Sequence, residues 1–136
     1  MENALLENDI KGTIGIQKYQ CTIEWRNGQM IMDEPVSSGG QDSGPDPYTT
    51  LLASLAGCTL ATLRMYIDRK GWNIPEISVT LNLSQNQDNG LTTTIKRDIF
   101  FGEGIEHQVQ ERLLVIATKC PVSKILENKI IIQTTA

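Results

Sequence analysis

The sequence is poor in aromatic residues, histidine and cysteine, and it carries no excess of basic charge. Phe, Trp and Tyr make up 5% of 136 residues, and His107 is the single histidine. Lys and Arg total 12 against 16 Asp and Glu, which gives a net charge of −4. Proteins that bind nucleic acid or anionic membranes over a whole surface carry net positive charge. We therefore expect neither nucleic acid nor a membrane among the partners.

The three cysteines, Cys21, Cys58 and Cys120, are too few and too far apart for a disulfide scaffold. None belongs to a Cys-x-x-Cys pair, so a four-ligand zinc site would need all three together with His107. We expect no metal and no cofactor. The useful question is whether any of the cysteines is reactive.

Residues 1–9 have neither the basic start nor the apolar run of a secretory signal, and we expect a cytoplasmic protein. The length and the 40% apolar content suit one globular domain over residues 1–136. Within it, residues 1–9 are expected to be loosely ordered.

Residues 10–34 alternate apolar and polar residues with a period of two, which predicts strands. Asn27-Gly28 predicts a two-residue hairpin turn, because both residue types accept a positive φ, with a return strand over Gln29–Asp33. Three antiparallel strands are expected. The polar, Gly-rich residues 37–45 that follow predict a loop.

A long helix is predicted from Pro47 to about Lys70. Asp46 can act as its N-cap and Pro47 as its first residue, while Gly71 suits the position after its end. Between residues 48 and 67 only Arg64 is charged. Polar residues interrupt the apolar content too often for a membrane span. Because so apolar a helix needs more cover than one small sheet provides, we expect a dimer.

The rest of the chain predicts two strands, two helices and a closing strand. The strands are expected over residues 77–84 and 91–101, and Arg97 shares the apolar face of the second one. A helix carries Ile105, Val109, Leu113, Ile116 and Ala117 at helical spacing. A short helix opens at Cys120-Pro121, and a strand covers Lys129–Thr134. The predicted order is βββ-α-ββ-α-α-β, an α+β fold with antiparallel sheets.

The local sequence pattern predicts different roles for the three cysteines and a surface position for the histidine. Cys58, in the middle of the long helix, is on periodicity alone a small buried apolar residue. Cys120 is predicted at the N-cap of a helix, where free backbone N–H groups and nearby Lys119 and Lys124 favour a thiolate. Cys21 is expected in the core of the first sheet. His107 falls off the apolar stripe of its helix and is expected at the surface.

Two segments carry a resemblance to a known family. Gly44-Pro45-Asp46-Pro47-Tyr48 leads into Leu51–Thr59 with Cys58, and Cys120-Pro121-Val122-Ser123 follows 120 − 58 = 62 residues later. Together they resemble the OsmC/Ohr family of osmotically inducible and organic hydroperoxide resistance proteins, in an OsmC-like branch with the Gly-Pro-x-Pro-Tyr motif. The resemblance covers residues 10–134.

The resemblance implies an interlocked homodimer around the long helix and a bacterial, peroxiredoxin-like antioxidant activity against organic hydroperoxides. Cys58 would attack the peroxide and become a sulfenic acid, and Cys120 would resolve it as a disulfide. A lipoyl or thioredoxin-like dithiol would then restore both thiols.

The chain departs from the family pattern at one pair of charges. In the peroxidases a glutamate near the start of the long helix pairs with an arginine, whereas this chain has Tyr48 and Thr49 there. Arg26 is the best match for the arginine, and Arg97 is the alternative from the strand pattern. The alternative function is a non-catalytic OsmC-like protein that binds a small hydrophobic ligand or responds to redox state.

Overall fold

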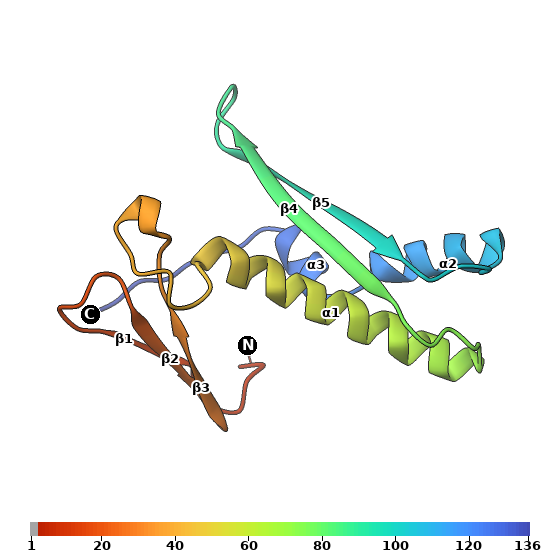
Figure 1. The fold of residues 1–136 in the computed structure, drawn as a ribbon, viewed down its shortest axis with the longest axis horizontal. Helices are drawn as coiled ribbons and strands as arrows, with labels where there is room; N and C mark the ends of the chain where they lie inside the picture. The colour runs from red at the N-terminus through yellow and green to blue at the C-terminus, as the bar shows by residue number, and fades with distance from the viewer. Residues whose placement is uncertain (1–2) are drawn as a thin grey trace. The chain divides into compact units, whose positions relative to one another are not determined.

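The computed structural model describes residues 3–136 and contains two antiparallel sheets and three α-helices (Figure 1). Its residues group into two compact units, one ending at Leu51 and the other beginning at Leu52. The expected α+β fold is confirmed, while the expectation of one domain over residues 1–136 stays a prediction. Residues 1 and 2 of the segment expected to be loosely ordered lie outside the described residues.

The first unit contains a three-stranded sheet in the order β1-β2-β3. Its strands are β1 (Lys11–Ile14), β2 (Cys21–Trp25) and β3 (Gly28–Met32). Trp25 pairs with Gly28, so the turn consists of Arg26 and Asn27, one residue earlier than predicted. Among the described residues, Asn27 and Gly28 are not in the positive-φ region, and that part of the prediction is wrong. Gly28 matters for space, because a Cβ there would lie 2.7 Å from the Trp25 ring.

The loop after β3 is organised around the carboxylate of Asp33. Its two oxygens accept hydrogen bonds from the backbone N–H groups of Tyr19, Glu34, Gln41 and Ser43 and from the Ser43 hydroxyl. These donors hold the pKa of Asp33 at about 2, the Ser43 hydroxyl foremost, although burial opposes the shift. The loop predicted here is confirmed, with one short 3-10 helix, η1 (Val36–Ser38).

The long helix α1 (Pro47–Lys70) has the predicted bounds. The Asp46 carboxylate accepts the Tyr48 N–H at 3.1 Å, as an N-cap does. At the other end Gly71 has a φ of 69°, and the N–H groups of Gly71 and Trp72 donate to the carbonyls of Asp68 and Ile67. This pair of hydrogen bonds is the Schellman motif that ends many helices.

The second unit packs the later part of α1 against a hairpin and a helix. The hairpin consists of β4 (Ser78–Asn86) and β5 (Thr92–Phe100), and the helices are α2 (His107–Ala117) and α3 (Pro121–Leu126). Leu63 and Ile67 of α1 meet Phe101 and Leu113 in the core. The far end of the hairpin extends away from the helices (Figure 1), and residues 84–94 are exposed.

The closing strand predicted over Lys129–Thr134 is absent from the structure. Ile130, Ile131 and Ile132 are 54%, 70% and 84% exposed. A strand requires hydrogen bonds to a neighbouring strand, and within residues 3–136 no strand pairs with this segment.

Among the described residues, α1 alone is long and apolar enough to span a membrane by length and composition. The same criteria are met by core helices of soluble proteins, and α1 supplies buried residues to the core of the second unit. We interpret it as a core helix.

Candidate active site

Cys58 lies on α1 in the second unit and is half-buried. Its Sγ accepts a hydrogen bond from the backbone N–H of Val122 at 3.5 Å. Val122 is in the first turn of α3, where N–H groups have no partner within the helix. The segments that carry Cys58 and Cys120 are therefore in contact, although 62 residues separate these two cysteines.

Cys120 is the N-cap of α3, as predicted, and it is fully buried. Its Sγ accepts the backbone N–H of Ser123 at 3.4 Å and lies 3.1 Å from the Ser123 hydroxyl. Pro121 at the first helical position needs no N–H partner. The thiol thus lies at the positive end of a helix, where the Ser123 N–H donates to its sulfur and the Ser123 hydroxyl contacts it.

Arg97 of β5 brings a positive charge to this thiol. The alternation along β5 turns Arg97 inward with Ile95 and Ile99, as the sequence predicted. Its Nη1 donates to Thr59 Oγ1 at 2.9 Å and to Ser123 Oγ at 2.8 Å, and it lies 4.0 Å from Cys120 Sγ. Because Ser123 Oγ accepts from Arg97, its own proton is available to donate to the sulfur.

Burial of Cys120 opposes its ionisation. The side chain and the N–H of Ser123, with further contacts from Cys58 and Thr59, outweigh that effect and lower the pKa of Cys120 from 9.0 to about 7. A thiolate is both the nucleophile and the better leaving group in disulfide exchange. The site therefore contains one thiol prepared for that chemistry and a second, more accessible thiol beside it.

A cavity of about 280 Å³ adjoins these residues. Arg97, Ser123 and Glu127 contribute polar groups to its wall, and the side chains of Leu55, Ile95 and Leu126 make part of it apolar. A mixed lining of this kind suits a small organic molecule with one polar group.

The structure places the other predicted residues as follows. Arg26 is exposed in the turn of the first unit, and its role at the thiols stays a prediction. Cys21 is half-buried on β2. His107 is at the surface, as predicted, and pairs with Glu111 at 2.9 Å. No group of His, Cys, Asp and Glu able to hold a metal occurs in residues 3–136.

Sequence reasoning missed the roles of Thr59 and Ser123. Each lies close to a cysteine in the chain, one residue after Cys58 and three after Cys120. The third position of a capped helix donates its N–H to the cap, so the spacing of Ser123 was the one available signal. Nothing in the sequence pairs Thr59 with Arg97, which is 38 residues away.

Solved structures similar to this chain include the following three. A putative osmotic stress induced and detoxification response protein from Psychrobacter arcticus is 20% identical, with a TM-score of 0.73 over 90% of this chain and 91% of that one. An organic hydroperoxide resistance protein OsmC from Legionella pneumophila is 20% identical, with a TM-score of 0.69 over 91% of both chains. OhrB of Bacillus subtilis is 19% identical, with a TM-score of 0.64 over 90% and 91%.

These likenesses show that the fold is shared. A comparison with curated proteins by sequence finds no match. The family model described as OsmC-like protein matches residues 40–135, which include both cysteines and Arg97. This chain belongs to the OsmC-like protein family.

Proposed function

We propose that this protein reduces organic hydroperoxides with Cys58 and Cys120. The observation that carries the proposal is the contact of Cys58 with the helix that Cys120 caps, the Val122 N–H to Cys58 Sγ hydrogen bond of 3.5 Å. Two thiols of different accessibility, one half-buried and one buried, then share one site. Proteins of similar fold that are named organic hydroperoxide resistance proteins support the same reaction class.

The reaction begins at the more accessible thiol. Cys58 Sγ attacks the terminal oxygen of the hydroperoxide, the S–O bond forms, the O–O bond breaks and the alcohol leaves. The Cys120 thiolate then attacks the sulfur of the Cys58 sulfenic acid, and the disulfide forms with release of water after proton uptake. A lipoyl or thioredoxin-like dithiol reduces the disulfide and completes the cycle.

The apolar part of the cavity supports an organic substrate rather than hydrogen peroxide. Leu55, Ile95 and Leu126 line it beside Ser123, whose hydroxyl contacts Cys120 Sγ. An alkyl or aryl group could be buried against these side chains while its peroxide group faces the thiols.

In this proposal the arginine of the site is Arg97. Family resemblance points to Arg26, and it places a glutamate where this chain has Tyr48 and Thr49. Arg97 lies 4.0 Å from Cys120 Sγ and uses Thr59 and Ser123, in place of a carboxylate, to fix its guanidinium. Loss of turnover in Arg97→Gln but not in Arg26→Gln is the expected result, and the reverse result would restore Arg26.

We also propose a cytoplasmic homodimer. One face of α1 exposes Ala53, Gly57, Ala61 and Met65 at spacings of four residues. Met65 is 65% exposed, and a Cβ at Gly57 would meet no atom within 4 Å. Small residues at this spacing allow a second helix to approach closely, which would cover the apolar face.

The second candidate is a non-catalytic protein that binds a small hydrophobic ligand or responds to redox state. The cavity beside Arg97 and Ser123 favours it, because the apolar part of its wall would bind such a ligand without any reaction. Tyr48 and Thr49 in place of the family glutamate agree with this reading.

Stoichiometric oxidation separates the two candidates. Reduced protein receives one equivalent of cumene hydroperoxide, and free thiols and intact mass are then followed with time. Peroxidase chemistry predicts loss of two thiols and about 2 Da, abolished in Cys58→Ser and unchanged in the matched control Cys21→Ser. Cys120→Ser should accumulate a Cys58 sulfenic acid that dimedone traps. If all three thiols remain unchanged, the peroxidase proposal is rejected and the non-catalytic binding protein remains as the candidate.

A further inference from the structure

The two thiols of the site differ in what surrounds them. Four polar atoms lie within 4.0 Å of Cys120 Sγ, at the N–H and hydroxyl of Ser123, at Thr59 Oγ1 and at Arg97 Nη1. Cys58 Sγ accepts one backbone N–H. Cys120 is buried and Cys58 is half-buried. The contacts that stabilise negative charge therefore surround Cys120 Sγ, whereas Cys58 Sγ is the sulfur more exposed to solvent.

Among residues 3–136 no carboxylate forms an ion pair within 4.0 Å of Arg97, although Glu127 lines the same cavity. The ion pairs among residues 3–136 are Arg64–Asp68 and His107–Glu111, and neither includes Arg97. Its Nη1 is instead directed at two hydroxyls and a sulfur. A negative charge on Cys120 would lie 4.0 Å from this half-buried guanidinium and would be stabilised by it.

We propose that Arg97, acting directly and through Ser123, makes Cys120 the leaving sulfur when the Cys58–Cys120 disulfide is reduced, so that an external thiolate attacks Cys58. This inference rests on the proposed function for the existence of that disulfide. It concerns the reductive half of the cycle, in which the direction of attack determines which cysteine carries the mixed disulfide.

The exchange balances as two successive displacements. The external thiolate forms a bond to Cys58 Sγ, the bond between the two cysteine sulfurs breaks, and its electron pair leaves on Cys120 Sγ. A second external thiolate attacks the external sulfur of the mixed disulfide and releases Cys58 as a thiolate. The two external thiols are oxidised to a disulfide, and the protein gains two electrons.

Two physical effects favour this direction. The half-buried Cys58 offers an approach that the buried Cys120 does not. The sulfur that leaves as the more stable thiolate leaves faster, and the hydroxyl and N–H of Ser123, which contact Cys120 Sγ, lower the pKa of that thiol. The greater exposure of Cys58 would by itself direct the external thiolate to that sulfur. The contribution of Arg97 therefore has to be measured as a change in the rate of reduction.

Diamide makes the disulfide without any hydroperoxide, so the test does not depend on peroxidase activity. Limiting glutathione is added, the reaction is quenched with acid, free thiols are alkylated, and peptides are identified by mass spectrometry. Glutathione is expected on Cys58, with the alkyl label on Cys120, in at least about tenfold excess over the reverse. Glutathione mainly on Cys120, or equally on both, would overturn the proposal.

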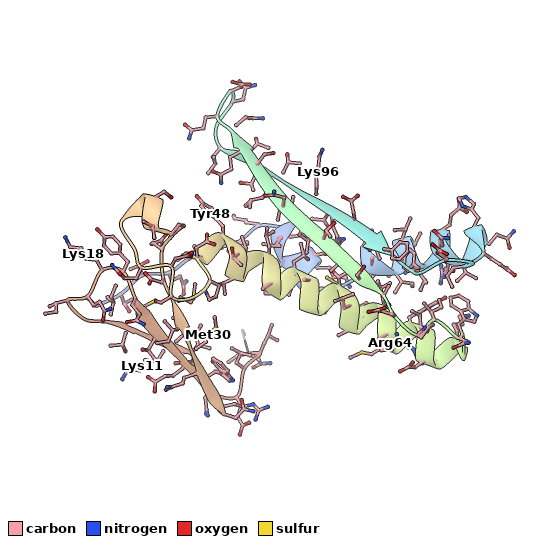
Figure 2. All side chains as sticks on the ribbon, viewed as in Figure 1. Lys11, Lys18, Met30, Tyr48, Arg64 and Lys96 are labelled. Carbon is pink, nitrogen blue, oxygen red and sulfur yellow. The ribbon has the colours of Figure 1, made fainter. Side chains whose placement is uncertain are left out.

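Rates of disulfide reduction then isolate the contribution of Arg97. Arg97→Gln should lower the second-order rate constant by roughly three- to tenfold, because the leaving thiolate loses the cation that lies 4.0 Å from it. Arg97→Lys should recover part of the rate, because it keeps the charge. Lys96→Gln is the matched control, since Lys96 is the neighbouring cation on the outer side of β5 (Figure 2) and is exposed.

Ser123→Ala tests the same idea with Arg97 in place, and it should also slow reduction because the hydroxyl no longer contacts the sulfur. Equal rates in Arg97→Gln, Ser123→Ala and the parent protein would overturn the proposal. A disulfide that diamide cannot form would overturn it as well. If glutathione attacks Cys58 in the diamide-made disulfide but cumene hydroperoxide does not oxidise the thiols, the proposed peroxidase activity is rejected and the direction of attack stands.

Discussion

Arg97 of β5 donates a hydrogen bond of 2.9 Å to the hydroxyl of Thr59, which is the residue next to Cys58 on α1. The same hydroxyl donates to the Leu55 carbonyl at 2.7 Å, and Thr59 is fully buried. One side chain thus connects the strand that carries the guanidinium with the helix that carries the accessible thiol. The connection fixes Arg97 without a carboxylate, which would compete with Cys120 for its charge.

Thr59→Val should therefore weaken the site more than its change in shape suggests. Valine keeps the volume but offers no acceptor, so the half-buried guanidinium loses a partner. We expect a loss of about 1–3 kcal/mol in the free energy of unfolding and a higher pKa for Cys120. Urea denaturation measures the first, and the ultraviolet absorbance of the thiolate measures the second.

The control for this prediction is Thr62→Val, which makes the same change one helical turn later on α1. Thr62 is half-buried and away from the contacts of Arg97. An equal loss of stability in both variants, with no change in the Cys120 titration, would contradict the role given to Thr59.

The pH dependence of stability follows from the Cys120 thiol. Its pKa falls from 9.0 to about 7 in the folded protein, so the unfolded chain binds the proton more tightly. The stabilisation is complete above pH 9 and is lost as the pH falls through 7. Relative to Cys120→Ser, the reduced protein should gain about 2 kcal/mol in unfolding free energy between pH 7 and pH 9.

Urea denaturation at several pH values under reducing conditions measures this difference. Cys21→Ser should follow the parent protein, because it leaves Cys120 and its donors unchanged. A parent protein and a Cys120→Ser variant with parallel curves would show that Cys120 titrates near its ordinary pKa.

The elements that local signals specify were predictable from the sequence. Asp46, Pro47 and Gly71 set the ends of α1 through backbone hydrogen bonds made within a few residues. The alternation along β5 placed Arg97 on the inner face beside Ile95. Cys120 before Pro121 predicted the cap of α3. Each signal acts over one or two turns of the chain.

What the sequence could not specify depends on distant or missing neighbours. The choice of Arg97 as the cation at Cys120 arises from packing between β5, α1 and α3, which no local pattern encodes. The turn after Trp25 lies one residue earlier than predicted, because Gly28 pairs with Trp25 and leaves space for its ring. The apolar residues 130–132 have strand character and no partner strand in the described chain.

Asp33→Asn should loosen the loop that precedes α1. An amide cannot accept the hydrogen bonds that converge on both carboxylate oxygens, and its own N–H₂ group would face donors. We expect amide exchange at Gln41 and Ser43 to accelerate by at least about tenfold, which corresponds to the loss of a charge-assisted hydrogen bond. Asp42→Asn is the control, because it removes a charge from the same loop at an exposed position.

The acid response distinguishes this role from a general loss of structure. With a pKa held at about 2, the Asp33 carboxylate stabilises the fold above its ordinary pKa near 3.8, and that stabilisation disappears as the pH falls through 2. Asp33→Asn should lack this acid-sensitive component while Asp42→Asn keeps it. Equal acid midpoints in the parent protein and Asp33→Asn would contradict the assignment.

Ala61→Glu tests the proposed homodimer. Ala61 lies in the middle of the exposed face of α1 that Gly57 and Met65 continue. A carboxylate there is solvated in a monomer but loses its hydration in a helix–helix interface, so it should dissociate the dimer without unfolding the chain. Light scattering after gel filtration should show the parent protein at twice the monomer mass of 15.1 kDa and the variant at that mass.

Gln108→Glu is the control for this prediction, because it adds the same charge to an exposed position of α2 and should remain dimeric. A parent protein that is monomeric at all concentrations would require another explanation for the exposed face, and a dimeric Ala61→Glu would place the interface elsewhere.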